Sequence, residues 1–134
     1  MVNYLFLLFN VPILIGQNII YTKTYPSGKP KIISYIVNKG VDKVRTEEYF
    51  GNGTLKKEGY YQFGSKQGKW TSYYSSGNLK KKENFNNDKL DGEMITWYQN
   101  GKKKEKGIFS NGKREGIFFS WKEDGSLYSK QSFV

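Results

Sequence analysis

The chain has 134 residues and a net charge of +10, and it contains no cysteine and no histidine. These absences exclude disulfides, zinc sites built on Cys or His, and catalysis by a thiolate or a histidine base. Aromatic residues make up 17% of the chain and glycine is abundant, a composition that favours strands joined by turns. We therefore expect one all-β domain.

The first 16 residues carry no charge and are nearly all apolar. Their length fits the hydrophobic region of a secretory signal and is too short for a transmembrane helix. We expect residues 1–16 to be a signal peptide and the protein to be secreted or periplasmic. Because no Lys or Arg lies in this segment, a buried N-terminal strand, an uncleaved anchor or a cytoplasmic protein is the alternative.

Residues 17–43 are predicted to form an irregular first repeat. Residues 18–23 and 32–37 have strand composition, and the Pro-Ser-Gly sequence at 26–28 is typical of a β-turn between them. A second turn is expected at 38–40. Terminal repeats of a stack are often atypical because they cap it.

Residues 44–134 contain the clearer repeats, because glycine recurs there with a period of 24 residues. The two series of glycines are Gly53, Gly77, Gly101, Gly125 and Gly68, Gly92, Gly116. A fixed period of this length indicates a repeat architecture. Each unit has two strands, such as 68–74 and 78–85. We expect the first series of glycines to lie in two-residue type I′ turns, since Asn-Gly and Asp-Gly pairs favour them.

Alternation along these strands predicts which side chains are buried, because successive residues point to opposite faces. One face is expected to carry a file of large residues: Tyr61, Trp70, Phe85, Met94, Phe109, Phe118 and Phe133. Gly59 and Gly107 leave room beside this file. No segment has sustained helical spacing of apolar residues, so almost no helix is expected.

The other face is predicted to combine lysines with aromatics. The candidate binding residues are Lys56, Tyr73, Lys80, Lys82, Trp97, Lys104, Lys106 and Trp121. Such a surface suits an acidic protein, an anionic membrane or nucleic acid, although secretion argues against nucleic acid. The alternative is a solvated face on which lysine stems cover the aromatics.

No constellation in the sequence supports catalysis, a metal or a cofactor. Glu47 and Glu48 are neighbours, but neighbours on a strand point to opposite faces and cannot act as a pair. Asp88 and Asp91 flank a turn without the spacing of a calcium loop. The serines have no histidine partner. We expect the protein not to be an enzyme.

Three segments, residues 61–70, 85–94 and 109–118, share an aromatic, a turn and a glycine before the next strand. They resemble the MORN repeat, in the variant form found in bacterial proteins often labelled antitoxins. The resemblance covers about residues 49–134, with Asp88 in place of a turn glycine and Met94 in place of an aromatic. It implies tandem antiparallel hairpins in an elongated, twisted single sheet. It also implies a non-enzymatic scaffold that binds a protein or sometimes phospholipid, with an antitoxin or immunity role as the alternative.

Overall fold

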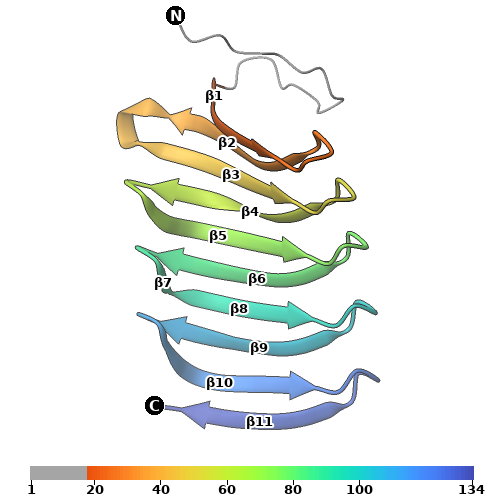
Figure 1. Ribbon diagram of the computed structural model, residues 1–134. Helices are drawn as coiled ribbons and strands as arrows, with labels where there is room; N and C mark the ends of the chain where they lie inside the picture. The colour runs from red at the N-terminus through yellow and green to blue at the C-terminus, as the bar shows by residue number, and fades with distance from the viewer. Residues whose placement is uncertain (1–17) are drawn as a thin grey trace, which may run out of the picture.

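The computed structural model describes residues 18–134, which form one open antiparallel sheet of 11 strands (Figure 1). The strands are β1 Asn18–Thr24, β2 Pro30–Asn38, β3 Lys43–Tyr49, β4 Leu55–Gln62, β5 Ser65–Tyr73, β6 Leu79–Asn86, β7 Lys89–Leu90, β8 Gly92–Trp97, β9 Lys103–Ser110, β10 Lys113–Trp121 and β11 Leu127–Phe133. The expected all-β architecture of tandem hairpins is confirmed. The proposed signal peptide lies outside the described residues.

The strands follow one another across the sheet in chain order because every connection is short. Only β7 lies off this path, where it pairs with β6. Within residues 18–134 the only helical turn is the 3₁₀ segment η1, Lys39–Val41, at the connection predicted for residues 38–40. That part of the chain has no helix long and apolar enough to cross a membrane.

At the strand ends on the right of Figure 1, three residues lie between the last hydrogen-bonded pair of each hairpin, such as Tyr74 and Asn78, and the third is a left-handed glycine. In the β5–β6 loop, the amide of Gly77 donates to the carbonyl of Tyr74 at 2.9 Å, and Gly77 has φ +90°. The two central residues of this turn have no positive φ, which a type I′ turn would require. The predicted left-handed glycines are therefore confirmed, but their assignment to two-residue type I′ turns is wrong. The left-handed Gly77 follows the turn as the third loop residue, a common solution for three-residue hairpins. A separate β-bulge follows at Lys80 in β6.

The type I′ turns lie instead at the other ends of the strands, at the left of Figure 1. There the two-residue loops have positive φ at both positions: Phe63-Gly64 at 49° and 78°, Asn87-Asp88 at 47° and 66°, and Asn111-Gly112 at 50° and 85°. Asn and Asp tolerate this backbone through local hydrogen bonding, so Asp88 keeps the turn without a glycine. The carboxylate of Asp88 also accepts the amide of Lys66 at 2.8 Å, which joins two successive turns.

One face of the sheet, here called the aromatic face, holds the predicted apolar file. Trp70, Phe85, Met94 and Phe118 are each at most 9% exposed. The rings of Trp70 and Phe118 meet their neighbours edge to face, with centroids 5.1 to 6.3 Å apart. Such pairs stabilise beyond the area that they bury. A single-layer sheet thus buries its apolar side chains against one another along the stack.

Two glycines make this packing possible. A Cβ atom on Gly59 would lie 2.1 Å from the ring of Trp70, and one on Gly107 would lie 2.3 Å from the ring of Phe118. In the repeat between them, Glu83 stands at the position of these glycines, and Met94 stands at the position of Trp70 and Phe118. A flexible methionine adapts more easily than a rigid aromatic ring to a neighbouring strand that carries a side chain in place of glycine. The exchange of both partners explains the departure of Met94 from the repeat pattern.

Candidate binding surfaces

The structure divides the eight predicted binding residues between the two faces. Tyr73, Lys82, Trp97, Lys106 and Trp121 lie on the face opposite the aromatic face. Lys56, Lys80 and Lys104 lie beside the rings of Phe50, Tyr74 and Tyr98, with Nζ 5.4 to 5.9 Å from the ring centroids. The prediction that all eight share a face is therefore wrong.

A β-bulge causes this separation. In β4, Leu55 pairs with Tyr49, whereas Lys57 pairs with Glu48, so Lys56 is an extra residue between them. The Nζ of Lys56 lies 3.7 Å from the carboxylate of Glu48 and thus on the same side as Lys57. An extra residue interrupts the alternation of side chains, and plain counting along the strand fails beyond it. The same register shift recurs at Lys80 and Lys104.

The C-terminal half of the opposite face forms a surface of aromatics, isoleucines and lysines. This surface, here called the Trp–Lys surface, comprises Lys82, Ile95, Trp97, Lys106, Ile108, Ile117, Phe119, Trp121 and Lys130. Ile108 and Ile117 are 50% and 44% exposed. Phe119 and Trp121 stack with ring centroids 5.9 Å apart, and the Nζ of Lys130 lies 5.8 Å from the Phe119 ring. The isoleucines, Phe119 and Lys130 were not predicted, although their alternation with the buried file places them on this face.

Lysines and apolar residues alternate within one row of this surface. Cα pairing places Lys82 beside Ile95, Ile95 beside Lys106, Lys106 beside Phe119, and Phe119 beside Lys130. Lys82 approaches the ring of Trp97 at 5.9 Å, and Lys106 forms an ion pair of 2.7 Å with Glu93. The row is thus both cationic and apolar.

Tyr73 belongs to a polar cluster on the N-terminal half of the same face, which sequence patterns did not reveal. Glu47 and Glu58 pair directly across β3 and β4, and Arg45 bridges their carboxylates at 2.8 and 2.9 Å. Tyr73 donates to Glu58 at 2.8 Å. Tyr35 and Tyr49 both donate to the second oxygen of Glu47, at 3.3 and 2.6 Å. Every carboxylate oxygen therefore has a partner, and the cluster is a satisfied structural network.

The phenols of this cluster resist ionisation. Burial, followed by the charge of Glu47, raises the pKa of Tyr35 to about 12. Burial and the hydrogen bond to Glu58 raise the pKa of Tyr73 to about 12. The pKa of Tyr49 is also raised, by burial and by its hydrogen bond to Glu47. A phenolate beside a carboxylate is disfavoured, so these tyrosines stay neutral donors.

Residues 18–134 contain no cluster of three or more Asp, Glu, His or Cys side chains that could hold a metal ion. The prominent features of the described chain are two surface regions on one face of the hairpin stack. They are the polar cluster around Arg45 in the N-terminal half and the Trp–Lys surface in the C-terminal half. Fold and surfaces together define an extended repeat scaffold.

Comparison with known protein families agrees with this class. The model of the MORN repeat variant family matches three consecutive stretches, residues 45–62, 66–87 and 90–111. The chain belongs to this family, whose repeats form non-catalytic scaffolds that generally bind proteins or membranes. No curated protein and no solved structure matches the chain.

Proposed function

We propose that this protein is a non-enzymatic scaffold that binds a protein partner through the Trp–Lys surface. The observation that carries the proposal is the apolar part of that surface, where Ile108 and Ile117 are half exposed on the same face as the stacked pair of Phe119 and Trp121. Contiguous exposed apolar side chains are characteristic of interaction sites. Aromatics at the centre of an interface also contribute most of the binding energy.

The test begins with partners cross-linked to the protein in its native host and then purified separately. Calorimetry with the purified partner compares wild type, an Ile108→Thr and Ile117→Thr double variant, and Tyr128→Thr. Threonine suits strands, so the double variant is expected to fold. Tyr128 is 71% exposed and lies outside the surface, which makes it the matched control.

The double variant is expected to bind about tenfold or more weakly, because exposed isoleucines at an interface lose their apolar contacts. The control is expected to bind like wild type. Equal affinity of all three proteins would show that the partner does not use the Trp–Lys surface.

Peripheral binding to anionic lipid is a second candidate, and the row of alternating lysines and apolar residues favours it. Lys82, Lys106 and Lys130 flank Ile95 and Phe119, so cations and apolar groups would meet a headgroup layer together. Co-sedimentation with phosphatidylserine vesicles over a salt series tests this candidate. Binding that weakens with salt supports it, whereas no binding at low salt, or equal binding to neutral vesicles, argues against it.

We further propose that the protein is exported and that residues 1–16 are removed. Mass spectrometry of the protein from its native host tests this directly. An intact N-terminus in a cytoplasmic fraction would contradict export and support an antitoxin or immunity role, for which a toxin-like neighbouring gene is the simplest indication.

A further inference from the structure

Two lysines converge over the most buried aromatic ring of the aromatic face. The Nζ atoms of Lys57 and Lys66 lie 5.0 and 5.2 Å from the centroid of the Trp70 ring. Lys66 also lies 4.9 Å from the centroid of the Phe85 ring. Burial lowers the pKa of Lys57, and the adjacent charge of Lys66 lowers it further. The two ammonium groups are therefore close together in a partly desolvated place.

Nearby carboxylates are engaged elsewhere. Glu48 pairs with Lys56 at 3.7 Å, and Glu83 pairs with Lys81 at 3.2 Å. Asp88 accepts the backbone amide of Lys66 rather than its ammonium. Among residues 18–134, neither Lys57 nor Lys66 has a carboxylate oxygen within the 4.0 Å of an ion pair. Neither ammonium group thus forms an ion pair, although the charges of Glu48 and Glu83 partly offset the lowering of the Lys57 pKa.

The repeats themselves show what occupies the equivalent place elsewhere. Two repeats further on, Arg114 replaces Lys66 and packs on Phe118 and Phe133 at 4.9 and 5.3 Å, as Lys66 packs on Trp70 and Phe85. At the position of Lys57 the later repeat has Glu105, which borders the same shallow hollow as Arg114 and Phe118. A carboxylate of the chain therefore borders the same hollow as the cation there, although the two do not form an ion pair within 4.0 Å.

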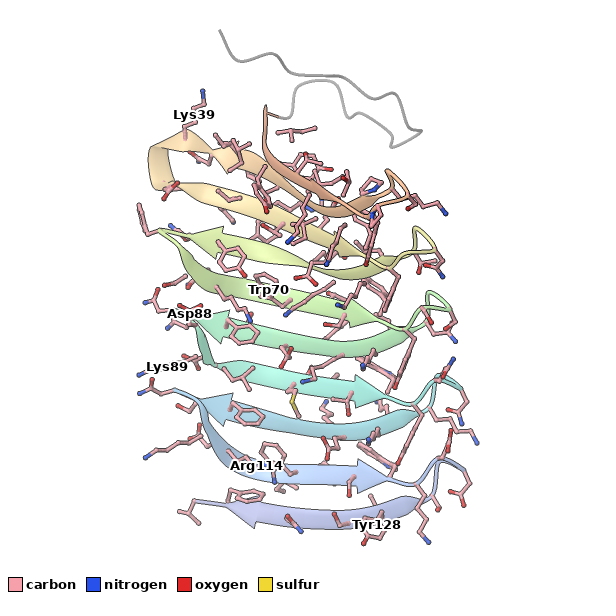
Figure 2. The ribbon with its side chains drawn as sticks, in the orientation of Figure 1. Lys39, Trp70, Asp88, Lys89, Arg114 and Tyr128 are labelled. Atoms are coloured by element: carbon pink, nitrogen blue, oxygen red, sulfur yellow. The ribbon has the colours of Figure 1, made fainter. Side chains whose placement is uncertain are left out.

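Figure 2 shows the setting of both places. Trp70 on β5 and Arg114 on β10 lie over the sheet, whereas Asp88 and Lys89 lie at a turn edge. A ligand that reaches the Lys57–Lys66 pair would therefore lie against the aromatic face, away from the Trp–Lys surface on the other side of the sheet.

We propose that the Lys57–Lys66 pair binds a carboxylate from an acidic side chain of the protein partner, supplying from outside the group that Glu105 supplies near Arg114. This inference rests on the proposed function, since it assumes a protein partner. Two ammonium groups share one carboxylate through charge-assisted hydrogen bonds, and the rings below exclude water on one side. The partner would then contact both faces of the sheet.

An NMR titration tests the pair without the partner. The probe is the capped peptide acetyl-Gly-Glu-Gly-amide, with acetyl-Gly-Gln-Gly-amide as its neutral control, at constant ionic strength. The reporters are the side-chain signals of Lys57 and Lys66 and the indole signal of Trp70, whose Nε1 is buried without an acceptor in the described structure. The glutamate peptide is expected to shift these signals saturably. Trp97 and Trp121, on the other face, serve as internal controls and stay unchanged.

Two charge reversals complete the experiment. Lys57→Glu creates the charge arrangement of Glu105 and Arg114, so it is expected to abolish the titration and to raise the melting temperature. Lys69→Glu changes the net charge equally at an exposed lysine on the opposite face and is expected to leave the titration intact.

The proposal would be overturned by no saturable shift, by equal shifts with the glutamine peptide, or by an unchanged titration in Lys57→Glu. Saturable shifts with inorganic phosphate but not with the glutamate peptide would assign the pair to phosphate and also overturn it. The titration contains no partner, so its failure would not contradict the proposed scaffold function. That function is tested separately by calorimetry with the Ile108 and Ile117 variant.

Discussion

At the scale of single residues, the contact between Gly59 and Trp70 decides how the aromatic face packs. Trp70 is 3% exposed and occupies the place that a side chain on the preceding strand would fill. The middle repeat solves the same problem with Glu83 and Met94, while the last pair returns to Gly107 and Phe118. Residue size is thus matched between neighbouring strands, and either partner alone cannot change freely.

Gly59→Ala is expected to lower the free energy of unfolding by about 1–3 kcal/mol, because its Cβ would overlap the Trp70 ring. Trp70→Met should lower the free energy of unfolding less in the Gly59→Ala background than in the wild type. The repeat that has Met94 and Glu83 at these two positions is the natural example of such a combination. Urea unfolding of the single and double variants measures this coupling. Gly51→Ala is the control, since its Cβ would meet nothing within 4 Å. Additive costs for the two changes would contradict the size match.

The tyrosines bonded to Glu47 and Glu58 predict a loss of stability in alkali. The pKa of Tyr35 and of Tyr73 is raised from 10.0 to about 12 in the folded protein. Their stabilising effect is complete below about pH 10 and is lost as pH rises towards 12, because the unfolded chain releases these protons first. Urea unfolding at several values of pH should show a smaller alkaline loss in Tyr73→Phe than in wild type. The exposed control Tyr128→Phe should follow wild type, and identical losses in all three proteins would contradict the prediction.

At the scale of the elements, the two rows of turns, one at each end of the strands, differ in turn type and in the hydrogen bonds between successive turns. In the row of three-residue loops, polar side chains donate hydrogen bonds to the next loop of the stack. Asn78 donates to the carbonyl of Gln99 at 2.9 Å, and Asn100 donates to that of Glu123 at 2.9 Å. Tyrosines add a second series, since Tyr74 and Tyr98 donate to backbone carbonyls one repeat further on, each at 2.8 Å. These bonds hold successive hairpins in one register.

Gly101→Val should destabilise the β8–β9 hairpin by about 1–3 kcal/mol, because Gly101 has φ +86° and a β-branched residue resists that backbone. Lys102→Thr is expected to stay within about 0.5 kcal/mol of wild type. Lys102 donates to the carbonyl of Asp124, but Thr54 at the equivalent position makes a similar bond to Ser75. Thermal unfolding separates the two variants. Equal melting of Gly101→Val and wild type would show that the left-handed glycine is dispensable.

At the scale of the whole molecule, the sheet has one layer and each strand depends on its neighbours. Residues in contact are close along the chain or one repeat apart, as expected for a stack in which each unit contacts only the next. No described side chain reaches less than 2% exposure. In the described part of the chain, β11 pairs with β10 alone, so one of its sides lacks strand partners.

Native-state hydrogen exchange should therefore rise towards β11. Amides in β4 to β6, paired on both sides, are expected to exchange about 100-fold or more slowly than amides of β11. Within β11, the amides that bond to β10 should be the more protected, which provides an internal control. Uniform protection across the sheet, or protection of all β11 amides, would instead indicate a partner strand from a second molecule.

The period of glycines, the strand composition and the absence of helical spacing determined the hairpin order, the strand positions and the buried file without any coordinates. These properties depend on local backbone preference and on alternation within one strand. The tertiary structure decided what depends on pairing between strands. Each bulge that separates Lys56, Lys80 or Lys104 from the face of Trp97 adds one residue to its strand relative to the paired strand. The type of each turn likewise depends on how many residues lie between two paired strands. The Arg45 cluster and the Lys57–Lys66 pair likewise form only when neighbouring strands pair. The sequence of one strand does not determine which residues of the next strand lie opposite it, because that depends on the pairing register.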